Sequence, residues 1–210
     1  MRALPVALAA LLVPALAAPA AAQGPCGQAL QAPAVGSWVD WTAAEGTMRL
    51  AVVGAEERAG KPHQWVEMKV TGARGGMVMK FLVPRYPYDP SEVKEVIMQP
   101  DGRPPMTMPA EMIQRMGQGG GPARELLARC GRATLVGTER ITVPAGNFST
   151  EHWRDAEDGT DVWVSKQVPF GLVKVQGKDG TNSIVLAGHG TGASTAITQE
   201  PVPMPGMPTR

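Results

Sequence analysis

Methionine is the residue type whose number and spacing first suggest chemistry in this 210-residue chain. Thioether sulfur is a soft ligand that suits Cu(I), and residues two apart in a strand share a face. The pairs Met77/Met79 and Met106/Met108 have this spacing, although no histidine lies between positions 64 and 151 to complete a copper site. Seven of the 12 methionines lie between positions 77 and 116: Met77, Met79, Met98, Met106, Met108, Met112 and Met116.

The same methionines permit two other interpretations. They could be ordinary core packing. They could also line an adaptable apolar surface for a flexible ligand, because the unbranched thioether side chain fills irregular space. The residues expected to line such a pocket are Met77, Met79, Phe81, Met112, Ile113 and Met116.

His152 and Ser165 raise the question of nucleophilic catalysis. If Asp158-Gly159 forms a two-residue turn, residue 154 faces residue 163, and one face carries His152, Arg154, Trp163 and Ser165. Such a face would place Arg154 over Trp163 as a cation–π pair. No Gly-x-Ser-x-Gly elbow surrounds Ser165, so we expect no catalytic residue and no enzymatic activity.

Metal-binding spacings are also missing. The histidines, His63, His152 and His189, are isolated from one another and from cysteine, so zinc is not expected. The acidic residues between 155 and 161 lack the spacing of a calcium loop and fit a solvated hairpin tip better. The sequence therefore predicts neither a metal site nor a cofactor.

The first 22 residues have the pattern of a secretory signal peptide. Met1-Arg2 gives a positive start, an apolar run follows to Ala18, and Ala20-Ala21-Ala22 supplies the small residues before a cleavage site. The run is too short for a membrane span, and Pro5, Pro14 and, directly after it, Pro19 interrupt the apolar stretch. We therefore expect a periplasmic or secreted protein that begins at Gln23.

The cysteines, Cys26 and Cys130, would then meet an oxidising compartment, which favours a disulfide bridge. The bridge would close a loop of about 100 residues, worth roughly 4–5 kcal/mol in the chain-entropy model. Two unpaired thiols are the alternative. Lipid attachment at Cys26 is disfavoured because Gln23-Gly24-Pro25 lacks the apolar-small-small run that precedes lipid-modified cysteines.

Composition limits the partners. The chain has net charge +1, and Arg2 is the only charge in the leader, so the remaining 188 residues are neutral (+1 − 1 = 0). A neutral chain without a Lys/Arg block is not expected to bind nucleic acid or an anionic membrane. No later run reaches eighteen apolar residues, so no transmembrane segment is expected.

Period-two patterns predict the elements that would position these residues. Strands are expected at 47–53, bounded by Gly46 and Gly54, and at 63–71, 77–83 and 93–98, and again through 132–189. Between them, helices are expected at 109–116 and 122–129, which make a helical insert over about 109–130. The expected organisation is an N-terminal segment at 23–35, one β-rich domain at 36–190, and a disordered Pro-rich tail at 191–210. The fold class is mainly β (α+β), with a curved antiparallel sheet or half-open barrel and one or two short helices on its concave side.

A resemblance supports this fold. The run Val143-Pro144-Ala145-Gly146-Asn147-Phe148, then Val162-Trp163-Val164-Ser165, then Val168-Pro169-Phe170-Gly171-Leu172-Val173 resembles uncharacterised secreted bacterial proteins related to the LolA/LolB-like lipoprotein-carrier superfamily. The resemblance implies a half-open barrel whose cavity holds acyl chains in the carriers.

We therefore expect a periplasmic, non-enzymatic binding or carrier protein for a lipid or acyl chain. A structural or interaction module of the cell envelope with a filled core is the alternative, and a Met-rich Cu(I) binder is a third hypothesis. The sequence names neither the ligand nor a protein partner.

Overall fold

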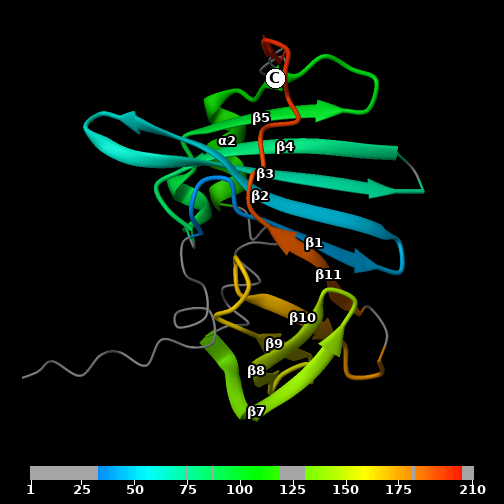
Figure 1. Cartoon of the computed structure of the whole chain (residues 1–210). Coiled ribbons are helices and arrows are strands. Elements are labelled where there is room, and N and C mark those ends of the chain that lie inside the picture. The colour runs from blue at the N-terminus through cyan, green and yellow to red at the C-terminus, as the bar shows by residue number, and fades with distance from the viewer. Residues whose placement is uncertain (1–32, 74, 87, 119–130, 181–182, 205–210) are drawn as a thin grey trace, which may run out of the picture.

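The computed structural model describes residues 33–73, 75–86, 88–118, 131–180 and 183–204. Its strands form one curved sheet of twelve strands in the order β12-β6-β5-β4-β3-β2-β1-β11-β10-β9-β8-β7, and the sheet stays open because β12 and β7 have no neighbour beyond them (Figure 1). The mainly β architecture predicted from the sequence is confirmed. In chain order the elements are β1 (Trp38–Ala43), β2 (Gly46–Arg58), β3 (Lys61–Gly72), β4 (Gly75–Val83), the 3₁₀ turn η1 (Pro90–Glu92), β5 (Glu95–Pro100), β6 (Met106–Thr107), α2 (Ala110–Gln118), β7 (Ala133–Val143), β8 (Gly146–Asp155), β9 (Asp161–Val164), β10 (Leu172–Gln176), β11 (Ile184–Gly190) and β12 (Val202–Pro203).

The β2–β3 hairpin is longer than the sequence pattern predicts. Gly54 does not end β2 but follows a bulge, where the register shifts between Val52 and Gly54. Glycine weakens a strand interior and often marks such a bulge. The hairpin continues to a tip where Ala59 has φ 50° and Gly60 has φ 72°. Two residues with positive φ make the tight turn whose twist matches that of the strands.

Side chains of β1–β5 alternate between two faces of the sheet. One face, here called the core face, packs against residues of β7, β8, β10 and β11 and of the loop before β10. A single core therefore joins the first half of the molecule, β1–β6, to the second half, β7–β11. The core face includes Val39, Trp41, Leu50, Val52, Val66, Phe81 and Val96.

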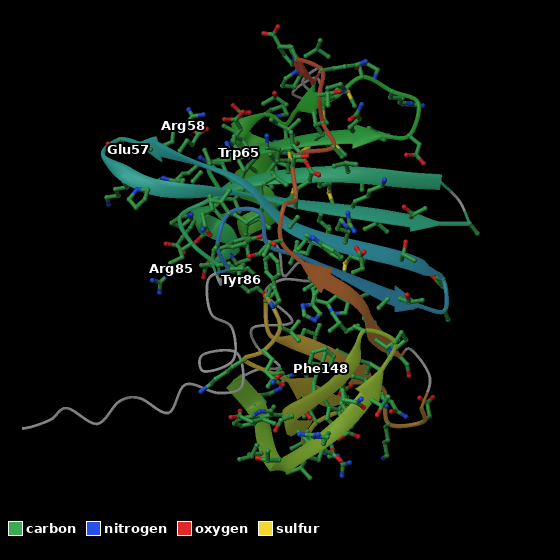
Figure 2. The ribbon with its side chains drawn as sticks, viewed as in Figure 1. Glu57, Arg58, Trp65, Arg85, Tyr86 and Phe148 are labelled. Atoms are coloured by element: carbon green, nitrogen blue, oxygen red, sulfur yellow. The ribbon has the colours of Figure 1, made fainter. Side chains whose placement is uncertain are left out.

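The loop before β10 supplies the aromatic centre of this core. Phe170 is 1% exposed although its φ is 64°, a conformation that costs free energy for a residue other than glycine. Its ring meets that of Tyr86 edge to face, with centroids 5.0 Å apart. Tyr86 lies after β4 (Figure 2), so this contact holds the loop of the second half against the first half.

Helix α2 and the C-terminal residues lie on opposite faces of the sheet. The helix begins where predicted, and the carbonyl oxygen of Pro109 accepts hydrogen bonds from the N–H groups of Met112 and Ile113. Residues 191–204, here called the strap, leave β11 and cross the other face of β2–β5, here called the strap face, before they reach β6 (Figure 1). Within the described ranges no helix has the length and apolar character that a membrane crossing needs.

The prediction of a disordered tail is wrong for residues 191–204. The strap ends in β12, which pairs in parallel with β6 through N–H groups of Val202 and Met204 that donate to carbonyl oxygens of Pro105 and Thr107 at 2.9 and 3.0 Å. Prolines at 201 and 203 alternate with these two donors. Proline fixes an extended φ and has no N–H, so it suits an edge strand and leaves few donors on its outer side.

The turn between β8 and β9 is also longer than Asp158-Gly159 predicts. The N–H of Asp155 donates to the carbonyl oxygen of Thr160 at 2.9 Å, so β9 pairs Asp161 with Arg154. The register differs from the predicted one by two residues. Because side chains alternate with a period of two, the same residues still share a face.

Several expectations concern residues outside the described ranges. They are the signal peptide at 1–22, most of the N-terminal segment 23–35, the helix at 122–129, and the pairing or lipid attachment of Cys26 and Cys130. These stay predictions.

Candidate functional site

A row of methionines crosses four neighbouring strands on the core face. Met68 of β3 is directly opposite Met79 of β4, Met79 is opposite Met98 of β5, and Met98 is opposite Met106 of β6. Directly opposed side chains have Cβ atoms about 4.5–5.5 Å apart, so the thioethers can contact one another along the row. Leu50 of β2 extends this row at the other end. We call Met68, Met79, Met98 and Met106 the methionine row.

The side chains of the methionine row are covered only in part by the described chain. All four side chains are half-buried. Met77 lies one pair further along β4 on the same face, opposite Val70, and Val70 is itself 37% exposed. The row therefore forms an apolar strip that the described parts of the chain cover only in part.

Helix α2 covers the neighbouring part of the core face. Ile113 (9% exposed) and Met108 (8% exposed) pack with the fully buried Val96, and Phe81, Met98 and Met112 adjoin this cluster. Five of the six predicted lining residues thus lie on the core face or in the part of α2 that packs against it. Met116 does not join them, because its side chain is 44% exposed and is not part of this cluster.

Two cavities of the described structure lie away from these residues. The larger, about 460 Å³, is at the β2–β3 hairpin end, near Arg58 (Figure 2). The smaller, about 230 Å³, lies between β7, β8 and the end of β9. The larger cavity is lined by Arg58, Ala59, Lys61, His63, Pro84, Glu92 and Lys94. Neither is lined by a predicted site residue, and Ile113 fills the space between α2 and β5 with its own side chain.

The strap face holds a buried carboxylate that sequence reasoning did not single out. Glu67 is 6% exposed, and its carboxylate accepts hydrogen bonds from the Thr195 hydroxyl at 2.6 Å and the Ala196 N–H at 2.9 Å. Beside it, Ile197 is 7% exposed and packs with Val78 and Ile97, with Trp65 next to them. These contacts fix the strap on the sheet. In the sequence, Glu67 looks like any polar residue of an alternating strand.

A charged network lies on one face of β7–β10. His152 stacks on Trp163, with ring centroids 4.4 Å apart. Its Nε2 lies 2.7 Å from an Asp161 oxygen and its Nδ1 lies 3.1 Å from a Glu139 oxygen. Both ring nitrogens thus lie within hydrogen-bond distance of a carboxylate, and these contacts fix the orientation of the imidazole ring. The Trp163 N–H also donates to Glu139 at 2.6 Å.

The predicted cation–π pair between Arg154 and Trp163 is wrong. Arg154 instead forms a two-pronged ion pair with Asp161, at 2.8 and 3.1 Å, because the register brings these two residues opposite each other. Lys174 takes the place above the indole, with its Nζ 4.6 Å from the ring centroid of Trp163.

Ser165 has a structural role in the same region. Its hydroxyl donates to the carbonyl oxygen of Ser149 at 2.8 Å and accepts from the N–H of Gln167 at 3.3 Å. Within the described ranges, no group of three His, Cys, Asp or Glu residues is arranged to hold a metal ion.

Asp161 and Glu56 have lowered pKa values. Burial would raise the pKa of Asp161, but hydrogen bonds from Arg154 and His152 outweigh it and lower the pKa below the usual value. Glu56 has a lowered pKa because the Arg58 guanidinium and the Trp65 N–H both donate to it. The pKa of Tyr86 is raised, mainly because its hydroxyl is buried.

Comparisons with known proteins give distant likenesses only. No family model and no curated protein matches the sequence. A crystal structure of a candidate lipoprotein from Parabacteroides distasonis is 14% identical over 75% of this chain and 96% of that chain, with a TM-score of 0.34. A candidate exported protein with a YmcC-like fold from Bacteroides fragilis is 11% identical over 77% of this chain and 99% of that chain, with a TM-score of 0.35. At these scores neither likeness transfers a ligand, an activity or a location, and the relation to LolA/LolB-like carriers stays a prediction.

Proposed function

We propose that this protein is an exported, non-enzymatic binding or carrier protein that holds a lipid or acyl chain along the methionine row. Export follows from the leader pattern of residues 1–22. The observation that carries the proposal is the half-buried strip of Met68, Met79, Met98 and Met106 across four strands. The ligand would lie along this row, beside α2, because Ile113 already occupies the space under the helix.

The chemistry of the strip suits a flexible apolar chain. Thioether side chains adopt many rotamers and so adapt to ligands of varying shape. An acyl chain that removed about 300 Å² of apolar surface from water would gain about 7.5 kcal/mol. Part of this gain offsets the entropy lost on association, so micromolar affinity or weaker is expected.

Lipid carriage is tested on protein purified gently from the cell envelope. Mass spectrometry of an organic extract should find a lipid bound in a defined ratio, and a fluorescent fatty acid should bind with saturation. Met79→Glu should weaken fatty-acid binding at least about tenfold, because it places a charge in the middle of the apolar strip.

Met116→Glu is the matched control, since Met116 has the same side chain but is exposed on α2. It should leave binding unchanged. Protein that carries no lipid and ignores the fatty acid, or equal losses in both variants, would contradict the proposal.

A structural or interaction module of the envelope remains the alternative. The filled contact between Ile113 and Val96 favours it, since a core occupied by its own side chains leaves less room for a ligand. Absence of lipid from the extract, together with capture of a defined envelope protein, would support this alternative.

Copper binding is a further candidate because the register brings four thioethers into one row. Three thioethers suffice in principle for Cu(I), which prefers soft sulfur ligands. Titration with Cu(I) should then give one site that disappears in Met79→Leu, whereas fatty-acid binding should survive this substitution because leucine keeps the apolar surface.

A further inference from the structure

The larger cavity lies where the β2–β3 hairpin extends past its neighbouring strands. The β2–β3 ladder continues to Arg58 and Lys61, beyond the last residue of β3 that pairs with β4 (Figure 1). Pro84 follows β4 and has no N–H with which to continue that ladder. The chain then returns through η1 to Lys94, so the hairpin and the β4–β5 connection enclose a cavity of about 460 Å³, here called the hairpin cavity.

Arg58 ties the hairpin tip to β5. Its Nη2 donates to the Glu95 carboxylate at 3.0 Å, and its Nε donates to Glu56 on the same strand. The bond to Glu95 holds the hairpin beside the first residue of β5 and so helps to keep the hairpin cavity open. Because two carboxylates balance its charge, Arg58 positions the hairpin and adds little to the attraction of a ligand.

Lys61 and Lys94 give the hairpin cavity its positive charge. Among the residues that the structure describes, neither ammonium group has a carboxylate partner. The backbone of Lys94 is fixed, since its N–H donates to the carbonyl oxygen of Leu82 at 2.8 Å. Glu92 also lines the cavity, but its carboxylate accepts the N–H of Asp89 at 3.1 Å in the cap of η1. Two unpaired cations against one carboxylate favour an anionic ligand.

His63 adds a fixed polar group to the wall of the cavity. Its side chain is 4% exposed, and its Nδ1 lies 2.9 Å from the carbonyl oxygen of Lys61. A carbonyl oxygen only accepts, so Nδ1 carries a proton and the ring orientation is set. In the described part of the chain, Gln64 Oε1 is the one fully buried side-chain nitrogen or oxygen without a hydrogen-bond partner. The Nε2 of His63, which bonds to no described group, therefore reaches the cavity that His63 lines.

We propose that the hairpin cavity binds a phosphate monoester. The phosphate would contact the ammonium groups of Lys61 and Lys94 and the Nε2 of His63. A phosphate monoester presents three acceptor oxygens and, with a second pKa of about 6, still carries a proton in part of the population near neutral pH. Ammonium groups donate to such oxygens, and an imidazole nitrogen donates when protonated and accepts a hydroxyl proton when it is not. The organic part of the ligand would lie against Pro84 and Ala59, which also line the cavity.

The hairpin cavity is separate from the methionine row. Lys94 lies four residues before Met98 in the chain, which is roughly 13 Å along an extended backbone, and no residue of the row lines the cavity. The proposal therefore does not rest on the lipid strip, and Met79→Glu should leave phosphate binding unchanged. A phosphate monoester occurs both in soluble molecules and as a lipid headgroup, and the experiment distinguishes these two sources.

The test is an NMR titration of the full chain with glycerol 3-phosphate. Amide signals of residues 58–63 and 92–94 should shift and saturate with a Kd of about 1 mM or tighter, and neutral glycerol should cause no saturable shift. Lys61→Met and Lys94→Met should each weaken binding at least about tenfold, because each removes a charged donor and keeps the aliphatic stem. Lys69→Met is the matched control, since Lys69 is an exposed lysine of β3 that does not line the cavity. It should leave binding unchanged.

Two further measurements make the result specific. The side-chain ¹⁵N resonance of His63 Nε2 should move on addition of glycerol 3-phosphate, which a ligand held only by exposed lysines would not cause. Vesicles of phosphatidylcholine that contain phosphatidate supply the same group as a lipid headgroup. Vesicle binding that requires phosphatidate and is lost in Lys94→Met assigns the site to a lipid, and binding of glycerol 3-phosphate alone assigns it to a soluble ester. The proposal is overturned if neither probe binds up to about 10 mM phosphate, if Lys69→Met weakens binding as much as Lys94→Met does, or if the Nε2 resonance does not respond.

Discussion

The two faces of the β1–β6 half differ in how their coverings are attached. On the core face, aliphatic and aromatic side chains from distant parts of the chain interlock, and α2 is anchored by Ile113 against Val96. On the strap face, residues 191–204 are held by the Glu67 carboxylate, by one buried side chain, Ile197, and by a few backbone hydrogen bonds that include the β12–β6 pairing. Apolar packing that involves many residues stabilises the whole fold. Hydrogen bonds to one carboxylate and the burial of one side chain stabilise mainly the segment that makes them.

The largest effect should come from the shared core. Phe170→Ala removes a ring that is 1% exposed and contacts Tyr86, so the free energy of unfolding should fall by about 3–5 kcal/mol. Urea denaturation should show the loss in one cooperative transition. Ile197→Ala on the strap face is the matched comparison, and it should shift the global midpoint far less because the strap can open alone. Equal shifts would break the distinction between the two faces.

Weakening the hydrogen bonds between Glu67 and the strap should have a smaller effect on stability, confined to the strap. Glu67→Gln keeps the shape but replaces charged hydrogen bonds with neutral ones, so the strap should lose about 1–3 kcal/mol. Hydrogen exchange of the Ala196 amide should speed up, while amides of β4 keep their protection. Glu57→Gln, at the exposed hairpin tip (Figure 2), is the control and should change neither. Global destabilisation by Glu67→Gln would show that the strap belongs to the main core.

Substitution within the methionine row should have little effect on stability. Met79→Leu conserves volume and apolar character at a half-buried position, so the free energy of unfolding should change by less than about 1.5 kcal/mol. Thermal denaturation measures this change. A larger loss would mean that the row is tightly packed core and would weaken the case for a ligand strip.

The smallest effect should come from the charged network of the second half. The pKa of Asp161 is lowered in the folded protein, so its ion pair stabilises the fold above the unfolded-state pKa, near 4, and this contribution is lost as the pH falls through the lowered value. Asp161→Asn should cost less than about 1 kcal/mol at pH 7 and nothing near pH 2. Denaturation at several pH values would show the two curves converging in acid; a constant gap would exclude the ion pair as the cause.

Strand positions were largely predictable because they follow from local alternation. The faces of β3 and β4 were correct, and the beginning of the helix, predicted at Pro109, was correct to within one residue. In the β8–β9 hairpin the turn length was wrong, yet His152 and Trp163 still share a face because the error was an even number of residues. The partner of Arg154 could not be predicted, since it depends on the register itself.

The strap was missed for a related reason. Residues 191–204 have the composition of a disordered segment, with few apolar residues and several prolines. Order comes from the burial of Ile197, from the Glu67 carboxylate more than 120 residues earlier in the chain, and from the pairing of β12 with β6. No local pattern connects them.

By itself, the sequence determined the strand and helix segments, the faces of each strand and the concentration of methionine near the helix, because these depend on the spacing of neighbouring residues. Only the tertiary structure decided that the methionines align into one row across four strands, that Met116 points away from it, and that the tail folds back over Glu67. These features depend on which strands become neighbours and in what register, and that choice is made by packing between residues far apart in the chain.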